Sequence, residues 1–245
     1  MPDVLSTDES NGKGIMAAEL SSLWWPLAVM AVDWVGVAGG WRRLEYVAKP
    51  GAIVALLAWL AWPAATHAWV PLLPLAWFAI GLICGLAGDV LLLLPERFFM
   101  AGLVAFLLGH LAYIVGLNDG GLFLPAEALL LVPVGLAGGW LAWRVGGALK
   151  ASGRDKLRVP VALYAAVISL MVVSALTTLF RPGWARGPAA LAAAGALLFF
   201  ASDAMLAWDR FVAPVPHGKL LVIVAYHLGQ MAIVFAAAGV FYGIP

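Results

Sequence analysis

Two aspartates, Asp89 and Asp203, lie near the ends of long apolar runs in matching settings. The first stands in the segment GDVLLLLPERF (88–98) and the second in SDAMLAWDRF (202–211), so Arg-Phe follows each seven or eight residues later. A carboxyl group in hydrocarbon costs roughly 2.5 to 3.5 kcal/mol even on the mildest scales, so a repeated one indicates a functional site. Two carboxyl groups held close together cannot both ionise readily, and one keeps its proton near neutral pH. The pair therefore predicts acid–base chemistry inside a membrane.

Further polar side chains follow each motif inside the next apolar run. A His-Leu pair occurs after both aspartates, at His110 and at His227, and Tyr113, Tyr226 and Gln230 lie within a turn of these histidines. Such groups can orient a substrate or a water molecule, but they can equally hydrogen-bond neighbouring helices. We carry all five as candidate substrate-binding residues, with helix packing as the alternative.

Three cations stand where a lipid phosphate could bind. Arg97 and Arg210 end the two motifs, and Lys49 precedes Pro50 at the start of another apolar run. Basic side chains at the interface hold the phosphate groups of lipids. The structural alternative is that each aspartate accepts hydrogen bonds from a neighbouring helix or pairs with Arg97 or Arg210, and that the arginines otherwise only follow the positive-inside rule. Asp33, midway along the first apolar run, has no counterpart in the repeat and is a second-tier candidate.

The composition identifies a polytopic membrane protein. Of the 245 residues, 64% are hydrophobic and 11% are charged, a balance that would leave large apolar patches on a water-soluble domain. The net charge of +1 offers no basis for nucleic-acid binding. The one cysteine, Cys84, excludes an internal disulfide and lies in an apolar run, as a small core residue does.

The apolar runs predict an all-α bundle of eight transmembrane helices, since each span needs about 20 apolar residues. The predicted helices are Leu23–Gly40, Gly51–Ala65, Pro71–Leu94, Phe98–Leu117, Pro125–Trp143, Val159–Leu179, Pro188–Trp208 and Leu220–Phe241. Residues 1–22 are polar, without the basic start and apolar core of a signal peptide. They predict a mobile tail before a catalytic domain of residues 23–245.

Lysine and arginine positions give the orientation in the membrane. The loops after the first, third, fifth and seventh helices hold eleven of the fourteen, and the tail and the remaining loops hold three. By the positive-inside rule, the odd-numbered loops face the cytoplasm and both termini lie outside. Asp89 and Asp203 then fall in the cytoplasmic half of the bundle.

The two motifs lie four helices apart, so their helices point the same way. This spacing predicts two parallel four-helix repeats, related by an axis along the membrane normal, which brings the two aspartates toward each other. At about 1.5 Å of rise per residue, Asp89, Asp203 and His227 share one level, whereas His110 lies deeper. All four together could hold zinc or iron, and the depth of His110 argues against that metal site.

These motifs resemble those of the YhhN-like lysoplasmalogenases, a family of integral membrane proteins. The resemblance rests on GD in the third helix, Arg-Phe at the next turn, a His-x-x-Tyr helix, SD in the seventh helix and Tyr-His-x-x-Gln in the last. The Lys49-Pro50 step before the second helix is also similar. The resemblance covers the chain from about residue 23 onward. It implies hydrolysis of the vinyl ether bond of lysoplasmalogens, with Asp89 and Asp203 as the catalytic residues.

The chemistry of a vinyl ether suits two carboxyl groups. Protonation at carbon forms an oxocarbenium-like ion that water captures, so one group must donate a proton and another must stabilise positive charge and activate water. The two carboxyl groups of glycoside hydrolases divide these roles at a related transition state. Asp89 and Asp203 can do so without a metal or cofactor. The partners are then water and a lysophospholipid, 1-alkenyl-glycerophosphocholine or -ethanolamine, which yields a fatty aldehyde and the glycerophosphodiester.

A proton-coupled lipid or small-molecule transporter is the alternative, because parallel repeats and paired intramembrane acids also occur in such carriers. A carrier places its acids near the midplane, whereas these two lie nearer one face. The sequence has no GxSxG, HExxH or P-loop, and no GxGxxG after a strand. The Ala, Gly, Leu and Arg bias, with no targeting segment, indicates a bacterial inner membrane.

Overall fold

The computed structural model describes residues 23–66, 72–119, 121 and 127–242, and the regular structure in those ranges is entirely helical. The α-helices are α2 (Trp24–Ala38), α3 (Arg42–Thr66), α4 (Leu72–Leu93), α5 (Phe99–Leu117), α6 (Leu131–Ala151), α7 (Arg158–Thr177), α8 (Arg186–Phe211) and α9 (Gly218–Phe241). Short 3-10 helices occupy Glu96–Phe98, Glu127–Leu130, Asp155–Leu157 and Thr178–Phe180. The predicted all-α class is confirmed. The predicted tail, residues 1–22, lies outside the described residues.

Seven of the eight predicted spans have the length and apolar character needed to cross a membrane. The exception is α2, whose 15 residues extend about 22 Å, short of the roughly 30 Å hydrocarbon core. A turn at Gly39 and Gly40, where Gly40 adopts a φ of 68°, separates α2 from α3. A left-handed φ of this kind is readily accessible to glycine. In the described part of the chain, the prediction of eight full-length spans is therefore wrong by one helix.

Helices α3 and α6 extend well beyond their predicted ends at basic residues. Helix α3 begins at Arg42 rather than Gly51, so Lys49 and Pro50 lie within a helix and not in a loop. Helix α6 continues to Ala151, two turns beyond the predicted end at Trp143. Long basic side chains can remain on a membrane helix because their aliphatic stems let the charge reach the interface. Lys49 is consequently carried on a rigid element.

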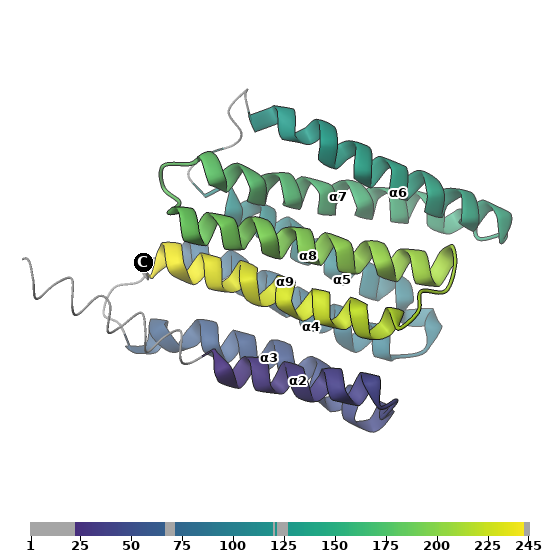
Figure 1. The fold of residues 1–245 in the computed structure, drawn as a ribbon, viewed down its shortest axis with the longest axis horizontal. Helices are drawn as coiled ribbons and strands as arrows, with labels where there is room; N and C mark the ends of the chain where they lie inside the picture. The colour runs from purple at the N-terminus through teal and green to yellow at the C-terminus, as the bar shows by residue number, and fades with distance from the viewer. Residues whose placement is uncertain (1–22, 67–71, 120, 122–126, 243–245) are drawn as a thin grey trace, which may run out of the picture.

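Consecutive helices run antiparallel across the bundle (Figure 1). The connections α2–α3, α4–α5, α6–α7 and α8–α9 all lie at one end, on the right in Figure 1. Helices α4 and α8, which carry the two aspartates, therefore run toward the same end. The duplication of a four-helix unit and the side of the membrane that this end faces remain predictions.

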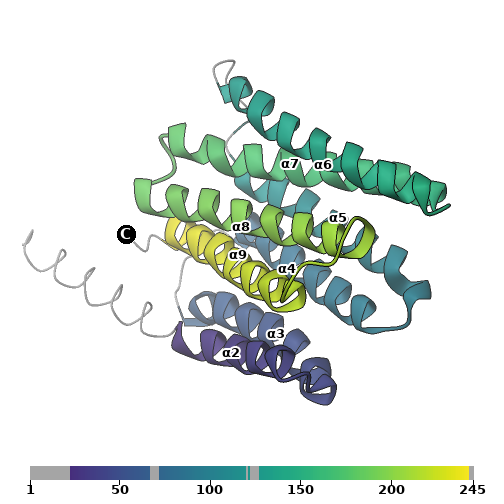
Figure 2. The ribbon, with the colours of Figure 1, turned by 45° about the vertical axis from the view of Figure 1, so that its right-hand side comes forward.

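The central helices are α4, α5, α8 and α9, with α2 and α3 along one edge and α7 followed by α6 along the other (Figures 1 and 2). Helix α9 packs against α8, α4, α3 and α2, and α7 packs against α5 and α8. Large apolar side chains such as Leu73, Leu136 and Val159 are at least 70% exposed on the outer surface. Such an apolar exterior is suited to lipid rather than to water.

Glycines allow the central helices to approach closely at the level of the candidate residues. A Cβ atom at Gly195 of α8 would lie 2.8 Å from the carbonyl oxygen of Gly229 in α9. A Cβ at Gly85 of α4 would lie 2.8 Å from the side-chain nitrogen of Gln230, and one at Gly88 would meet the ring of Phe106. Small residues of this kind are what close helix packing in lipid requires. They bring polar side chains of α4 and α9 into contact.

Candidate active site

Asp89 is fully enclosed near the end of α4, with a side chain that is 1% exposed. Its Oδ1 atom lies 3.2 Å from Nζ of Lys49 in α3. Its Oδ2 atom accepts a hydrogen bond of 2.8 Å from the hydroxyl of Tyr226 in α9. A buried carboxylate needs both a counter-charge and hydrogen-bond donors, and here two other helices supply them.

A chain of hydrogen bonds continues from Asp89 into the centre of the bundle. The side-chain nitrogen of Gln230 donates to the hydroxyl of Tyr226 at 3.3 Å. The side-chain oxygen of Gln230, Oε1, accepts a hydrogen bond from the hydroxyl of Tyr113 in α5. These three side chains are buried. Three of the eight residues predicted to bind substrate therefore form one network that holds Asp89.

Asp203, in α8, has a different set of neighbours. Its Oδ2 atom accepts a 2.5 Å hydrogen bond from the hydroxyl of Tyr164 in α7. Nε2 of His110 in α5 lies 3.7 Å from the same oxygen, a separation too long for a hydrogen bond. The side chain of Asp203 is 15% exposed, so this carboxyl group is reachable where that of Asp89 is not.

The predicted greater depth of His110 does not keep its ring away from Asp203, because Nε2 lies 3.7 Å from that carboxyl group. Helix α8 continues to Phe211, which places Asp203 about 12 Å from the end of its helix, and His110 lies about 16 Å from the start of α5. The extra turn of α8 brings the two side chains to neighbouring levels. His110 is fully buried, and neither of its ring nitrogens has a hydrogen-bond partner among the described residues.

The two aspartates lie in adjoining clusters rather than in direct contact among the described residues. Aromatic rings separate the clusters. Phe199 packs against Tyr226 at 5.2 Å and against His110 at 4.8 Å between ring centroids, and Phe106 packs against Tyr226 at 5.8 Å. The approach of the two carboxyl groups across a repeat axis therefore remains a prediction.

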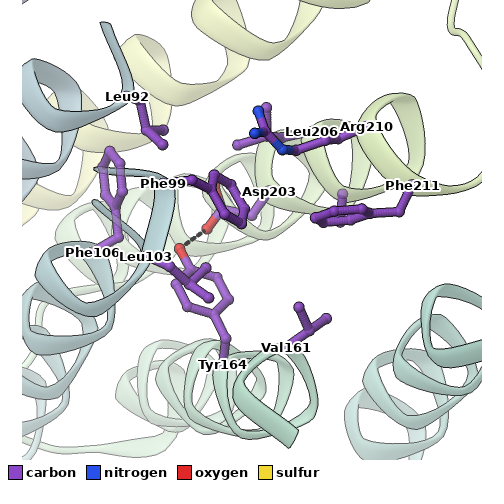
Figure 3. Close-up of a pocket in the computed structure, with 11 residues that line it drawn as sticks. Leu92, Phe99, Leu103, Phe106, Val161, Tyr164, Asp203, Leu206, Arg210 and Phe211 are labelled. Carbon is purple, nitrogen blue, oxygen red and sulfur yellow. Dashed lines mark hydrogen bonds between the residues drawn. The ribbon is translucent and has the colours of Figure 1, made fainter. Parts of the chain in front are cut away.

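An apolar pocket opens beside Asp203 (Figure 3). Figure 3 shows Asp203 and Tyr164 pointing toward each other, with the rings of Phe99 and Phe106 nearby. The cavity itself has a volume of about 50 Å³, and its other lining residues are mostly leucine, valine and phenylalanine from α4, α5, α7 and α8. The acid–phenol pair therefore lies in a mostly hydrocarbon wall, with Arg210 as the one other polar side chain among the lining residues that the structure describes.

Arg210 stands where this apolar pocket adjoins a second, more polar pocket. The polar pocket shares Leu92, Phe99, Leu206 and Arg210 with the first and also includes Lys49. The guanidinium carbon of Arg210 lies 4.0 Å from the centroid of the Phe99 ring, and one of its nitrogens lies 3.2 Å from a carboxylate oxygen of Glu96. Arg210 can therefore contact a ligand that enters either pocket.

The arginines do not pair with the aspartates in the part of the chain that the structure describes, but each aspartate accepts a hydrogen bond from a neighbouring helix, as the other form of the structural alternative expects. Arg210 pairs with Glu96, and the guanidinium of Arg97 lies over the ring of Phe98. Lys49, which lies within α3, is the basic residue that pairs with Asp89. Arg97 is not among the residues that line the two pockets.

His227 and Asp33 do not belong to the hydrogen-bonded network that holds Asp89. Nδ1 of His227 accepts a 3.0 Å hydrogen bond from the indole of Trp34 in α2. Asp33 is buried in α2, and its two carboxyl oxygens have no hydrogen-bond partner among the described residues. His227 and Asp203 were predicted to lie at the same depth in the bundle, but their side chains are not in contact.

Sequence reasoning missed Tyr164 and the rings of Phe106 and Phe199. The available signal for Tyr164 was a phenol in the middle of an apolar run, since a buried tyrosine hydroxyl usually finds a partner. A metal site would need the carboxyl and imidazole groups to converge, and within the described residues no three His, Cys, Asp or Glu side chains do so.

Comparison with known proteins identifies the family. Residues 44–237 match the YhhN family. The chain belongs to the YhhN family. The matched segment contains both aspartates, Tyr164, His110 and the network around Tyr226, but it begins after Asp33.

Relatives within the YhhN family come from mammals and bacteria. The human lysoplasmalogenase TMEM86B is 32% identical over 156 residues, which are 64% of this chain and 61% of the human protein. The rat lysoplasmalogenase TMEM86B is 29% identical over 199 residues, 80% of this chain and 73% of the rat protein. A lysoplasmalogenase of Mycobacterium tuberculosis is 31% identical over 175 residues, which are 68% of this chain and 61% of the mycobacterial protein. The chain thus spans about three fifths of the human and mycobacterial relatives. No solved structure is detectably similar to it.

Proposed function

We propose that this protein is a lysoplasmalogenase, which hydrolyses the vinyl ether bond of a 1-alkenyl lysophospholipid to a fatty aldehyde and a glycerophosphodiester. Membership of the YhhN family and relatives named lysoplasmalogenase support the activity. The observation that carries the proposal is the Asp203–Tyr164 pair in the wall of an apolar pocket. A single hydrocarbon chain suits the lining, and the enol ether at its end would reach the acid.

In this mechanism Asp203 is the acid. Its proton moves to the second carbon of the alkenyl chain, the carbon–carbon π bond breaks, and the positive charge is shared by the first carbon and the ether oxygen. Water then adds to the first carbon and returns a proton to Asp203. The resulting hemiacetal collapses as its carbon–oxygen bond to glycerol breaks, and the glycerol oxygen takes up the hemiacetal proton. Substrate and water thereby give aldehyde and alcohol, with Asp203 regenerated.

Tyr164 and Asp89 have supporting roles in this mechanism. The hydroxyl of Tyr164 holds Oδ2 of Asp203, which leaves the other oxygen to carry the proton. Asp89 remains ionised because Lys49 and the Tyr226 hydroxyl stabilise its charge. A fixed negative charge near the pocket favours the cationic transition state, because such preorganised electrostatics act strongly where water is excluded. Tyr113, Tyr226 and Gln230 position Asp89 rather than the substrate.

An assay of aldehyde release tests the proposal. Purified protein in detergent should release aldehyde from 1-alkenyl lysophospholipid and leave the saturated 1-alkyl analogue intact, because only the enol ether can be protonated at carbon. Asp203→Asn should lower kcat at least a hundredfold. Asp155→Asn is the control, since Asp155 is 58% exposed outside both pockets. Failure of the wild-type protein to release aldehyde would exclude the activity, and proton-coupled lipid uptake into vesicles would favour a transporter.

A further inference from the structure

The polar pocket that adjoins the Asp203 pocket carries charges of both signs. Its polar lining comprises Glu45, Lys49, Asp209, Arg210 and Lys219. These charged residues come from α3, α8 and α9, and apolar residues of α2, α4 and α5 complete the wall of the pocket at the end of the bundle where α4 meets α5. A site for a simple anion would have only cations in its wall. This one pairs three cations with two carboxylates.

Most of these charges already have partners within the protein. Lys49 binds Asp89, Arg210 contacts Glu96, and Asp209 accepts a 2.7 Å hydrogen bond from the backbone nitrogen of Val215. Glu45 and Lys219 are different, because neither has an ion-pair or side-chain hydrogen-bond partner among the described residues. One free carboxylate and one free ammonium group therefore face the same pocket from α3 and α9.

We propose that this pocket binds the headgroup of a single-chain ethanolamine phospholipid. Lys219 and Arg210 hold the phosphate, and Glu45 accepts hydrogen bonds from the primary ammonium group. The proposal rests on the lysoplasmalogenase function above and specifies its substrate. Arg210 borders both pockets, so a phosphate held there leaves the glycerol and its ether chain to enter the pocket of Asp203.

The lining favours ethanolamine over choline for a chemical reason. A primary ammonium group donates three hydrogen bonds, which a carboxylate accepts as strong charge-assisted bonds. A choline group has no N–H donor and is typically held by a cage of aromatic faces. The aromatic residue in this pocket is Phe99, and Arg210 already lies over its ring. Glu45 therefore distinguishes the two headgroups.

Equilibrium binding of lipids that cannot be cleaved tests the site without relying on turnover. The probes are 1-alkyl lysophospholipids bearing ethanolamine, choline or an unsubstituted phosphate, titrated against purified protein in detergent. The wild-type protein should bind the ethanolamine lipid most tightly. Glu45→Gln should weaken binding of that lipid about tenfold, which corresponds to about 1.4 kcal/mol, and leave binding of the unsubstituted phosphate lipid unchanged or tighter. Lys219→Gln should weaken all three, and Asp155→Asn should alter none.

Several outcomes would overturn the site. One is that the wild-type protein binds the ethanolamine lipid and the unsubstituted phosphate lipid equally tightly. Another is that Glu45→Gln changes the binding of all three probe lipids to the same extent. Binding of a diacyl ethanolamine lipid as tight as that of the single-chain lipid would also contradict it. If the Glu45→Gln variant still binds the unsubstituted phosphate lipid at least as tightly as the wild-type protein does, the variant is folded. If Glu45-dependent binding occurs but 1-alkenyl lipids are not hydrolysed, the headgroup site stands and the proposed activity fails.

Discussion

The hydroxyl of Tyr164 donates a 2.5 Å hydrogen bond to Oδ2 of Asp203, and both side chains line the same apolar pocket. The bond joins α7 to α8, so it fixes the carboxyl group from a neighbouring helix. The ring of Tyr164 also packs edge-on against His110, with centroids 5.2 Å apart. Tyr164 therefore both orients the carboxyl group of Asp203 and packs against His110. A substitution that removes only its hydroxyl can separate the two effects.

Tyr164→Phe keeps the ring and removes only the hydroxyl. Asp203 becomes charged as it gives up its proton in the transition state, and a hydrogen bond to a charged group is worth about 1.5 to 3 kcal/mol. The kcat/KM for a 1-alkenyl lysophospholipid should therefore fall about ten- to a hundredfold. The ring contact with His110 persists, and the midpoint of thermal unfolding should change little. Steady-state kinetics and thermal unfolding in the same detergent measure both quantities. An unaltered kcat/KM would mean that the hydroxyl does not position the acid.

Lys49 and Asp89 should behave as a coupled pair in stability. Lys49→Met leaves a carboxylate that is 1% exposed without its counter-charge, and breaking a buried pair in this way costs about 3 to 5 kcal/mol. Asp89→Asn should cost less, because Lys49 is 16% exposed and its ammonium group can reach water. The double variant Lys49→Met/Asp89→Asn should regain most of the loss.

Reversible unfolding of the four proteins gives the coupling energy of this pair. Additive losses in the double variant would show that Lys49 and Asp89 do not interact energetically, whatever their 3.2 Å separation. Activity provides a second readout, since the double variant should fold but hydrolyse lipid slowly for lack of the fixed negative charge.

The helices and the two aspartates could be predicted from the sequence because both follow from local rules. A span requires about 20 apolar residues, and an acid within such a run stands out at once. Helix ends at basic residues could not be placed as well, because the stems of Arg42 and Lys49 allow a helix to continue where charge suggests a loop. This error put Lys49 in a loop and hid its pairing with Asp89.

The partners of each acid depend on which helices are neighbours, and sequence spacing does not determine that. Tyr164 lies on α7, which packs against both α5 and α8, so it reaches Asp203 only through tertiary packing. The proximity of His110 to Asp203 was missed for the same reason, since α8 continues three residues beyond its predicted end. The two motifs drew attention to both acids, whose catalytic role remains a prediction, but not to the separate clusters that surround them.

Gly85→Ala should lower activity by disturbing the support of Asp89. The added methyl group would lie 2.8 Å from the side-chain nitrogen of Gln230 and 3.1 Å from the hydroxyl of Tyr226. Because Tyr113 also holds Gln230, the amide has little room to move, and Tyr226 should shift away from Asp89. Overpacking of this kind typically costs about 1 to 3 kcal/mol.

Gly139→Ala in α6 is the matched control, because nothing lies within 4 Å of its Cβ position. Alanine is the better helix former by up to about 1 kcal/mol, so this variant should be as stable as the wild-type protein or slightly more stable. Thermal unfolding and aldehyde release should both separate the two variants. Equal activity of Gly85→Ala and Gly139→Ala would argue against a role for the Tyr226 network in supporting Asp89.

Cysteine labelling in cells should show that the end of the bundle carrying the polar pocket faces the cytoplasm. The α4–α5 and α6–α7 connections lie at the same end (Figure 1), and most lysines and arginines are in the segments that were assigned to that side. In a Cys84→Ala background, Ser152→Cys marks the α6–α7 connection and Gly183→Cys marks the α7–α8 connection at the opposite end; both positions are exposed. A membrane-impermeant maleimide should label Gly183→Cys in intact cells and Ser152→Cys only after permeabilisation. The reverse pattern would place the headgroup pocket on the outer face, and its lipid would then come from the outer leaflet.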